Sequence, residues 1–341
     1  MKKILFTKSG TKGWYVEVHI EYLIRYLSDE FIIEQADIPF KPYKDFLDRF
    51  PETSPLEKNP DDYDFIIPEL GTHPHVSTED YGEKMSCLSW EGLEGYHDKM
   101  RFGGAMSPDS EKAYRDSNVP YHSLRIGIDS ELFKSIPTAR EDDLLNVGFV
   151  GSIGNPRHRA IDIYRTLKDV EGIRLMFFPS VWNNNNQEIT QYGVDADGNS
   201  INDNEIKEFI KYIYGGNKRW VGVPNCYNQL DVLVRVEQNE EYGFPVLEAA
   251  ACGVPVIATD WGNVKSILDA GGGIRIERIL TIKEQMQKMK DAIIEMKEKP
   301  EWRKHLGELG RAEIERNWTW DKQLDNWRKF FREGANGQKR H

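Results

Sequence analysis

The stretch EEYGFPVLEAAACGVPVIAT, residues 240–259, decides the fold of this chain of 341 residues. Pro245 suits the first turn of a helix, where its missing N–H costs nothing, and Gly253 suits the left-handed position that follows a helix. The spacing therefore predicts a helix between these two residues. The apolar run of residues 254–259 predicts a parallel strand covered on both faces, and residues 232–236 predict another strand before the loop.

The start of this helix is a predicted anion site. Its first-turn N–H groups and the positive end of its dipole lie beside the turn at Gly243 and Phe244, where a phosphate would bind. Glu240 lies ahead of the helix and Glu248 about one turn inside it. Carboxylates accept hydrogen bonds from sugar hydroxyls, so this arrangement predicts a nucleotide-sugar site. The alternative interpretation is that Glu240 and Glu241 are solvated acids of a loop and that Glu248 is a surface residue of the helix.

The two glutamates enclose seven residues and are part of a denser pattern. They resemble the E-x7-E signature of retaining GT-B glycosyltransferases, especially glycosyltransferase family 4, together with Gly243, Pro245, Ala249, Gly253, Pro255 and Val256. The resemblance implies that Glu240 contacts the donor sugar and that Glu248 holds the ribose hydroxyls. It also implies that the backbone amides of Gly243 and Phe244 bind the diphosphate. Tyr242, where the family often has phenylalanine, is expected in the same donor site.

Length and composition limit the class of protein. The chain is long enough for two domains with full cores. The formal charge of −11 argues against a protein that mainly binds a nucleic-acid backbone. Three cysteines, Cys87, Cys226 and Cys252, lack metal-ligand or redox spacing, which predicts reduced thiols in a cytoplasmic protein. No apolar stretch approaches the roughly 20 residues that span a bilayer. The short strand that follows the first three residues is too short for a signal peptide.

The N-terminal half begins as a βα unit. A strand at residues 4–7, a loop with Gly10 and Gly13, and a helix from residue 16 to residue 27 would place a ligand at the carboxyl end of the strand. An ordinary turn is the alternative. The resemblance implies that Gly10 and Gly13 face the donor phosphates and the acceptor.

The acceptor side departs from the family. After a strand predicted over residues 85–90, members commonly have a His-Asp pair, whereas this chain has Trp90 and Glu91. His97, followed by Asp98, is a candidate replacement for the acceptor-side histidine. The alternative is that His97 is a surface residue of a loop.

The boundary between the halves also matches the family. Gly127-Ile128-Asp129, with Phe133 four residues on, resembles a hallmark at the end of the N-terminal domain, and Gly127 is expected to let the chain turn sharply. The resemblance implies an α/β GT-B fold, with two Rossmann-like domains that face each other across a cleft. The expected division is residues 1–138 on the acceptor side, residues 139–318 on the donor side, and residues 319–341 as a helix that returns to the first domain, followed by a tail.

Arginines follow the first strand of the second half. Guanidinium groups in such a loop can bind a diphosphate bidentately and neutralise its charge as it leaves. The family usually has an arginine immediately after the strand, where this chain has Ser152, and a lysine several residues later, near Arg157 and Arg159. Arg159 is the first candidate and Arg157 the second, with Ser152 beside the donor. The alternative is an exposed basic loop.

No cofactor or metal ion is expected. Asp195-Ala196-Asp197 invites comparison with the D-x-D metal motif of GT-A glycosyltransferases and with the start of a calcium loop. It lies among asparagines and glycines instead of ending a strand, and the glycine and closing glutamate of a calcium loop are misplaced.

The sequence therefore predicts a metal-independent, retaining hexosyl- or pentosyltransferase. It would move a sugar from a nucleotide-sugar donor to a hydroxyl of a glycan, protein or small-molecule acceptor. A nucleotide-sugar epimerase of GT-B type and a non-catalytic subunit that binds donor or glycan remain alternatives. The departures at Trp90, Glu91 and Ser152 favour the non-catalytic subunit, whereas the glutamate pair favours the enzyme.

Overall fold

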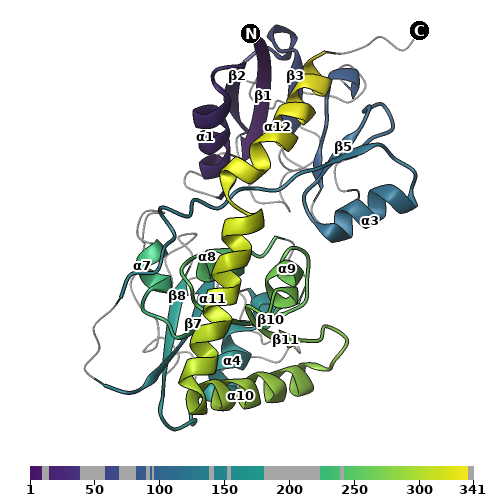
Figure 1. Ribbon diagram of the computed structural model, residues 1–341. Coiled ribbons are helices and arrows are strands. Elements are labelled where there is room, and N and C mark those ends of the chain that lie inside the picture. Colours follow the sequence, from purple (N-terminus) through teal and green to yellow (C-terminus); the bar gives the residue numbers. More distant parts are fainter. Residues whose placement is uncertain are drawn as a thin grey trace. The chain divides into compact units, whose positions relative to one another are not determined.

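The chain forms two compact units. The computed structural model describes residues 1–9, 15–38, 58–68, 82–89, 93, 96–137, 142–151, 155–179, 223–238 and 242–336. Unit 1 consists of Met1–Gly127 and Trp320–His341, and unit 2 of Ile128–Thr319 (Figure 1). The two ends of the chain therefore belong to the same unit.

Unit 1 contains two parallel sheets of three strands each. The first has the order β2-β1-β3 and consists of β1 (Lys2–Ser9), β2 (Phe31–Ile38) and β3 (Phe65–Pro68). The second has the order β4-β5-β6 and consists of β4 (Leu88–Ser89), β5 (Gly103–Ala105) and β6 (Tyr121–Ser123). Its helices include α1 (Tyr15–Leu27) and α3 (Pro108–Asp116). The central residues 4–7 of β1 are all buried in succession, as expected of a parallel strand covered on both faces.

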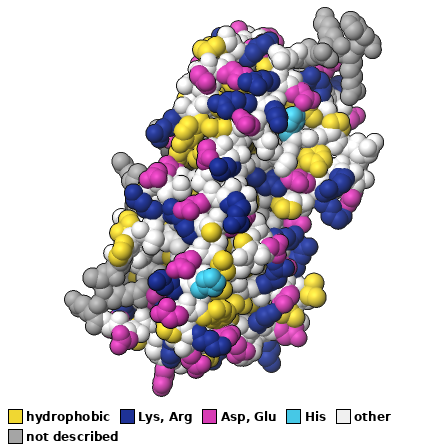
Figure 2. Space-filling model, in the orientation of Figure 1, with side chains coloured by type: hydrophobic (Ala, Val, Ile, Leu, Met, Phe, Trp, Pro, Cys, Tyr) yellow, Lys and Arg dark blue, Asp and Glu magenta, His cyan; other side chains and the backbone are white. Residues whose placement is uncertain are grey.

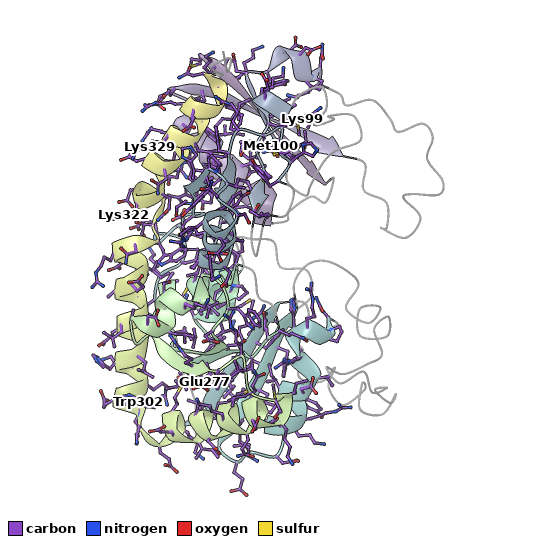
Figure 3. The ribbon with its side chains drawn as sticks, turned by 90° about the vertical axis from the view of Figure 1, so that its right-hand side faces the viewer. Lys99, Met100, Glu277, Trp302, Lys322 and Lys329 are labelled. Atoms are coloured by element: carbon purple, nitrogen blue, oxygen red, sulfur yellow. The ribbon has the colours of Figure 1, made fainter. Side chains whose placement is uncertain are left out.

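The C-terminal helix α12 (Trp320–Ala335) packs in unit 1 through its aromatic side chains. Phe330 meets Phe65 edge-on at 5.2 Å between ring centroids, and Phe331 meets Phe31 at 5.3 Å. Lys322 and Lys329 are exposed on the same helix and project outward (Figure 3). The helix is amphipathic, and its apolar face completes the core of unit 1.

Unit 2 is built on one parallel sheet with the strand order β11-β10-β9-β7-β8. Its strands are β7 (Leu145–Gly151), β8 (Ile173–Pro179), β9 (Val232–Arg235), β10 (Val256–Thr259) and β11 (Gly273–Ile276). Its helices include α4 (Ala160–Leu167), α7 (Val223–Tyr227), α8 (Phe244–Ala251), α9 (Val264–Asp269), α10 (Ile282–Glu298) and α11 (Pro300–Asn317). One core cluster joins α4 and α10 to the sheet, while α8, α9 and α11 contact one another (Figure 1).

The predicted α/β class with parallel sheets is confirmed, and so are the elements of the central stretch. The expected helix is α8, which starts one residue earlier than Pro245, at Phe244, and the expected strand is β10. Gly253 has the predicted left-handed backbone, with φ of 76°. Proline fits the second helical position as well, because the N–H groups of a first turn have no partner within the helix.

Gly127 has a structural role besides the expected sharp turn. Its φ is not positive, so the residue does not provide a left-handed turn. A Cβ atom at Gly127 would instead lie 2.5 Å from the Cα of Trp320. Glycine is therefore required by the close approach of two backbones at the start of α12.

Replacing each of two glycines of α11 by alanine is expected to have opposite effects on stability. A Cβ at Gly307 would collide with the carbonyl oxygen of Gly253, whereas a Cβ at Gly310 would lie 3.4 Å from the nearest atom. We expect Gly307→Ala to lower the free energy of unfolding by about 1–3 kcal/mol through overpacking. Gly310→Ala should raise it by up to about 1 kcal/mol, because alanine favours the helix. Urea unfolding of both variants measures this, and equal effects would contradict the packing of α11.

Two global features accompany this fold. In the part of the chain that the structure describes, none of the helices has the length and apolarity needed to cross a membrane. On the face drawn in Figure 2, Lys and Arg side chains are interspersed with Asp and Glu side chains. The described side chains on that face therefore form no continuous basic field of the kind that binds a nucleic-acid backbone.

Candidate donor site

The site begins at the turn before α8. Gly243 has φ of 80° and ψ of 31°, and a Cβ there would collide with Val264 of α9. Its carbonyl accepts hydrogen bonds from the N–H groups of Val246 and Leu247, at 2.9 and 3.1 Å. Only glycine combines this left-handed turn with the close approach of α9. The predicted turn therefore exists, and it places the amino end of α8 after the carboxyl end of β9.

The aromatic residues of this turn have a packing role. Tyr242 stacks on Phe244 with ring centroids 4.1 Å apart, and it meets Trp318 edge-on at 6.5 Å. All three side chains are buried. We predicted Tyr242 and Phe244 as donor-binding residues. The structure buries their rings in the core of unit 2, so what they could offer a ligand is backbone.

Glu248 is a buried carboxylate. Glu248 is only 3% exposed, so the alternative interpretation of this residue as a surface acid is wrong. The Tyr227 hydroxyl of α7 donates a hydrogen bond to Oε2 of Glu248 at 2.5 Å. Burial raises the pKa of Glu248 to about 8, while the Tyr227 hydrogen bond and the charge of Arg235 oppose this shift.

A buried ion pair, which the sequence analysis missed, lies at the same edge of the sheet. Arg235 ends β9 and pairs with Glu237, and both side chains are almost completely buried. The guanidinium also donates to the carbonyl of Val150 and lies 4.9 Å from the ring centroid of Phe149. Gly151, with φ of 147°, leaves room for it. The available signal was a charged residue inside an apolar strand.

Side chains from the end of β10 fix the segment after β9. The Thr259 hydroxyl lies 2.9 Å from both the N–H and the carbonyl of Glu237. Trp261 donates its indole N–H to the same carbonyl at 3.2 Å, and the Arg278 guanidinium lies 4.7 Å from the Trp261 ring centroid. The carboxyl ends of β7, β9 and β10 therefore form one connected polar edge, where open α/β sheets bind ligands.

The two candidate arginines occupy different environments. Arg157 is exposed in the short 3-10 turn η3 (Pro156–His158), and its carbonyl accepts a hydrogen bond from Gln238 N–H at 2.9 Å. Arg159 is buried and donates to Gln285 of α10. The loop of Arg157 thus contacts the segment that leads toward Glu240. Arg159, the first candidate in the sequence analysis, faces a neighbouring helix.

Several predicted residues lie outside the described residues: Gly10, Gly13, Trp90, Glu91, Ser152, Asp195, Asp197 and Glu240. His97 is described, in unit 1, where its Nδ1 lies 2.8 Å from Asp98 and its side chain is 37% exposed. Among the residues whose placement is given, no three His, Cys, Asp or Glu side chains form a metal-binding group. The three cysteines are buried, and none of them is in a disulfide bond within the described part of the chain.

Comparison with known proteins finds a family similarity in the second half of the chain. Residues 203–313 match the family described as glycosyl transferases group 1. We call residues 203–313 the group 1 segment, because they are similar to that family. This segment includes β9, α8 and β10, and with them Glu240 and Glu248.

A curated relative matches part of this chain. It is the GDP-mannose-dependent monoacylated alpha-(1-6)-phosphatidylinositol monomannoside mannosyltransferase of Corynebacterium glutamicum, and it is 34% identical over 82 residues. The match covers 24% of this chain and 20% of the relative. The chain therefore spans about a fifth of the length of that relative.

Solved structures match the whole chain. Sucrose-phosphate synthase from Thermosynechococcus elongatus aligns with a TM-score of 0.74 at 14% identity, over 99% of this chain and 100% of that chain. Anabaena HepE in complex with UDP and glucose aligns with a TM-score of 0.64 at 13% identity, over 98% and 99%. These likenesses confirm the predicted GT-B fold.

Proposed function

We propose that the protein is a retaining glycosyltransferase, which moves a sugar from a nucleotide-sugar donor to an acceptor hydroxyl without a metal ion. The observation that carries this proposal is the amino end of α8 at the polar edge of the sheet, together with the buried side chain of Glu248 on the same helix. The group 1 segment contains this helix, and a fold neighbour was solved with UDP and glucose.

The diphosphate would be bound at the start of α8. Backbone amides and the helix dipole stabilise a negative charge there, and Arg157 or Arg159 would add a guanidinium to the leaving group. The barrier in such a transfer is departure of the diphosphate from an oxocarbenium-like sugar. Hydrogen-bond donor groups that the fold already holds around the leaving group lower this barrier, because they need no reorganisation during the reaction.

The two glutamates would divide the recognition of the donor. Glu248 would accept hydrogen bonds from the ribose hydroxyls, and Glu240 would position the transferred sugar. We do not propose Glu240 as a covalent nucleophile. The acceptor hydroxyl would approach on the face from which the diphosphate departs, so that the diphosphate can accept its proton. The acceptor would be a glycan, a protein or a small molecule.

A panel of donors tests this proposal. We expect UDP-glucose or GDP-mannose, incubated with the protein in EDTA, to release UDP or GDP, and more rapidly with an acceptor present. The relative named above is GDP-mannose-dependent and the HepE complex contains UDP, so both bases belong in the panel. Binding without release would favour the non-catalytic subunit. Conversion of one nucleotide-sugar into another would favour the epimerase.

A further inference from the structure

Tyr227 connects Glu248 to a segment that lies outside the sheet. The tyrosine ends α7 and is completely buried, with its hydroxyl on Glu248. On its other side, its ring lies 6.2 Å from that of Phe133. Phe133 belongs to residues 128–136, the connecting segment, which opens unit 2. A single side chain therefore contacts both the connecting segment and the proposed ribose-binding carboxylate.

The connecting segment is held on α7 by side-chain hydrogen bonds. Asn228, next to Tyr227, accepts from the N–H of Ile136 at 2.7 Å and donates to the carbonyl of Lys134 at 3.0 Å. Arg311 of α11 donates to the carbonyl of Phe133 at 2.9 Å and to the carbonyl of Ala251 at the end of α8. The position of Tyr227 is thus fixed from both sides, by the connecting segment and by α8.

The charged and titratable groups around Glu248 come from several elements. α7 contributes Tyr227, and β9 contributes Arg235, which forms an ion pair with Glu237. Cys252 directly follows α8. Burial and the charge of Glu248 raise the pKa of its thiol to about 12, while the charge of Arg311 of α11 opposes this shift. The neighbouring α9 carries Lys265 and Asp269. Burial also raises the pKa of Tyr227 well above its usual value, so its hydroxyl remains a donor throughout the neutral range.

We propose that Tyr227 is a positioning residue of the donor site: its hydroxyl holds the Glu248 carboxylate in the orientation that accepts the ribose hydroxyls. This inference rests on the proposed function. The Tyr227 hydroxyl donates its hydrogen bond to Oε2 of Glu248, so the carboxylate cannot turn about its terminal bond without losing that hydrogen bond. Oε1 therefore points in one fixed direction before any ligand binds. The Glu248 side chain is already ordered in the free protein, so binding does not have to order it.

Tyr227→Phe tests the proposal, because it removes only the hydroxyl. We expect the affinity for UDP or GDP, whichever the wild-type protein binds, to fall about tenfold by calorimetry near neutral pH. The wild-type affinity should rise with pH as Glu248 ionises, since a carboxylate accepts hydrogen bonds more strongly than a carboxylic acid. The midpoint should lie near the pKa of about 8. In Tyr227→Phe it should move to higher pH, because the lost hydrogen bond favoured the ionised form.

Two controls separate positioning from structure. Glu248→Gln should remove the protein's part of the pH dependence and leave only the titration of the ligand. Tyr164→Phe makes the same change at another buried tyrosine of unit 2, on α4, and should leave both affinity and midpoint unchanged. Thermal unfolding of every variant shows whether it is folded.

The outcomes are distinct. A weaker affinity together with a displaced midpoint in Tyr227→Phe would support the positioning role. Wild-type affinity and midpoint in this variant would overturn it while leaving the proposed function intact. A lower affinity with an unmoved midpoint would overturn it too, since general loosening of the site predicts that result. Failure of the wild-type protein to bind UDP or GDP would overturn the proposed function and this inference together.

Discussion

Replacing Glu240 by alanine is expected to lower the rate of sugar transfer about 100-fold, because a small displacement of a reacting group costs about that much. Glu240 is proposed to hold the transferred sugar against its hydroxyls. Without that contact the anomeric carbon would no longer be held toward the acceptor. Steady-state release of UDP or GDP from the active donor, with acceptor present, measures the effect.

The neighbouring Glu241 provides the matched control, since it is the same residue type at the adjacent position of the sequence. Glu241→Ala should keep the wild-type rate. The affinity of Glu240→Ala for UDP or GDP should also be unchanged, because these ligands carry no sugar for Glu240 to contact. Undiminished transfer by Glu240→Ala, or equal losses in the two variants, would refute the assigned role.

Variants of Glu240 and of Glu248 should therefore differ in which measured quantity they lower. Loss of Glu240 should affect transfer and spare the binding of a nucleoside diphosphate, whereas Glu248→Gln should weaken that binding. The split follows from which part of the donor each carboxylate is proposed to contact. Because one variant removes interactions with the sugar and the other with the ribose, the ratio of kcat to KM effects separates them.

The central unit could be predicted from sequence because its signals are local. Pro245 and Gly253 limit α8 from either end, and the uninterrupted apolar run after Gly253 identifies β10. The turn at Gly243 follows from glycine before a helix, and the structure adds that its backbone is left-handed. Each of these signals depends on neighbours within a few residues, where backbone sterics and helix capping act.

The partners of the site residues could not be predicted in this way. Glu248 and Tyr227 are 21 residues apart in the chain, and their contact depends on how α7 packs against α8. Arg235 reaches Val150 only because β9 pairs with β7 in the sheet. The burial of Arg159 likewise results from α10, which lies more than 100 residues later. Tertiary packing decides all three, and spacing within a loop carries no information about it.

The buried ion pair at the edge of the sheet should have a large effect on stability when it is broken. Arg235→Met leaves the Glu237 carboxylate buried without its counter-charge, and we expect this to lower the free energy of unfolding by about 3–5 kcal/mol. The double variant Arg235→Met with Glu237→Leu should recover most of that loss, because two apolar side chains of similar volume need no solvation. Urea unfolding followed by tryptophan fluorescence gives both values.

Arg275→Met is the matched control for this pair. Arg275 lies on β11 of the same sheet and pairs with Asp269, but the two side chains are 40% and 66% exposed. Its loss should cost about 1 kcal/mol or less, since water and salt screen an exposed pair. If Arg235→Met were as mild as Arg275→Met, the carboxylate of Glu237 would have to reach solvent or take up a proton. Arg235 also opposes the rise in the pKa of Glu248, so a variant that keeps its fold should bind nucleoside diphosphates with a midpoint at higher pH.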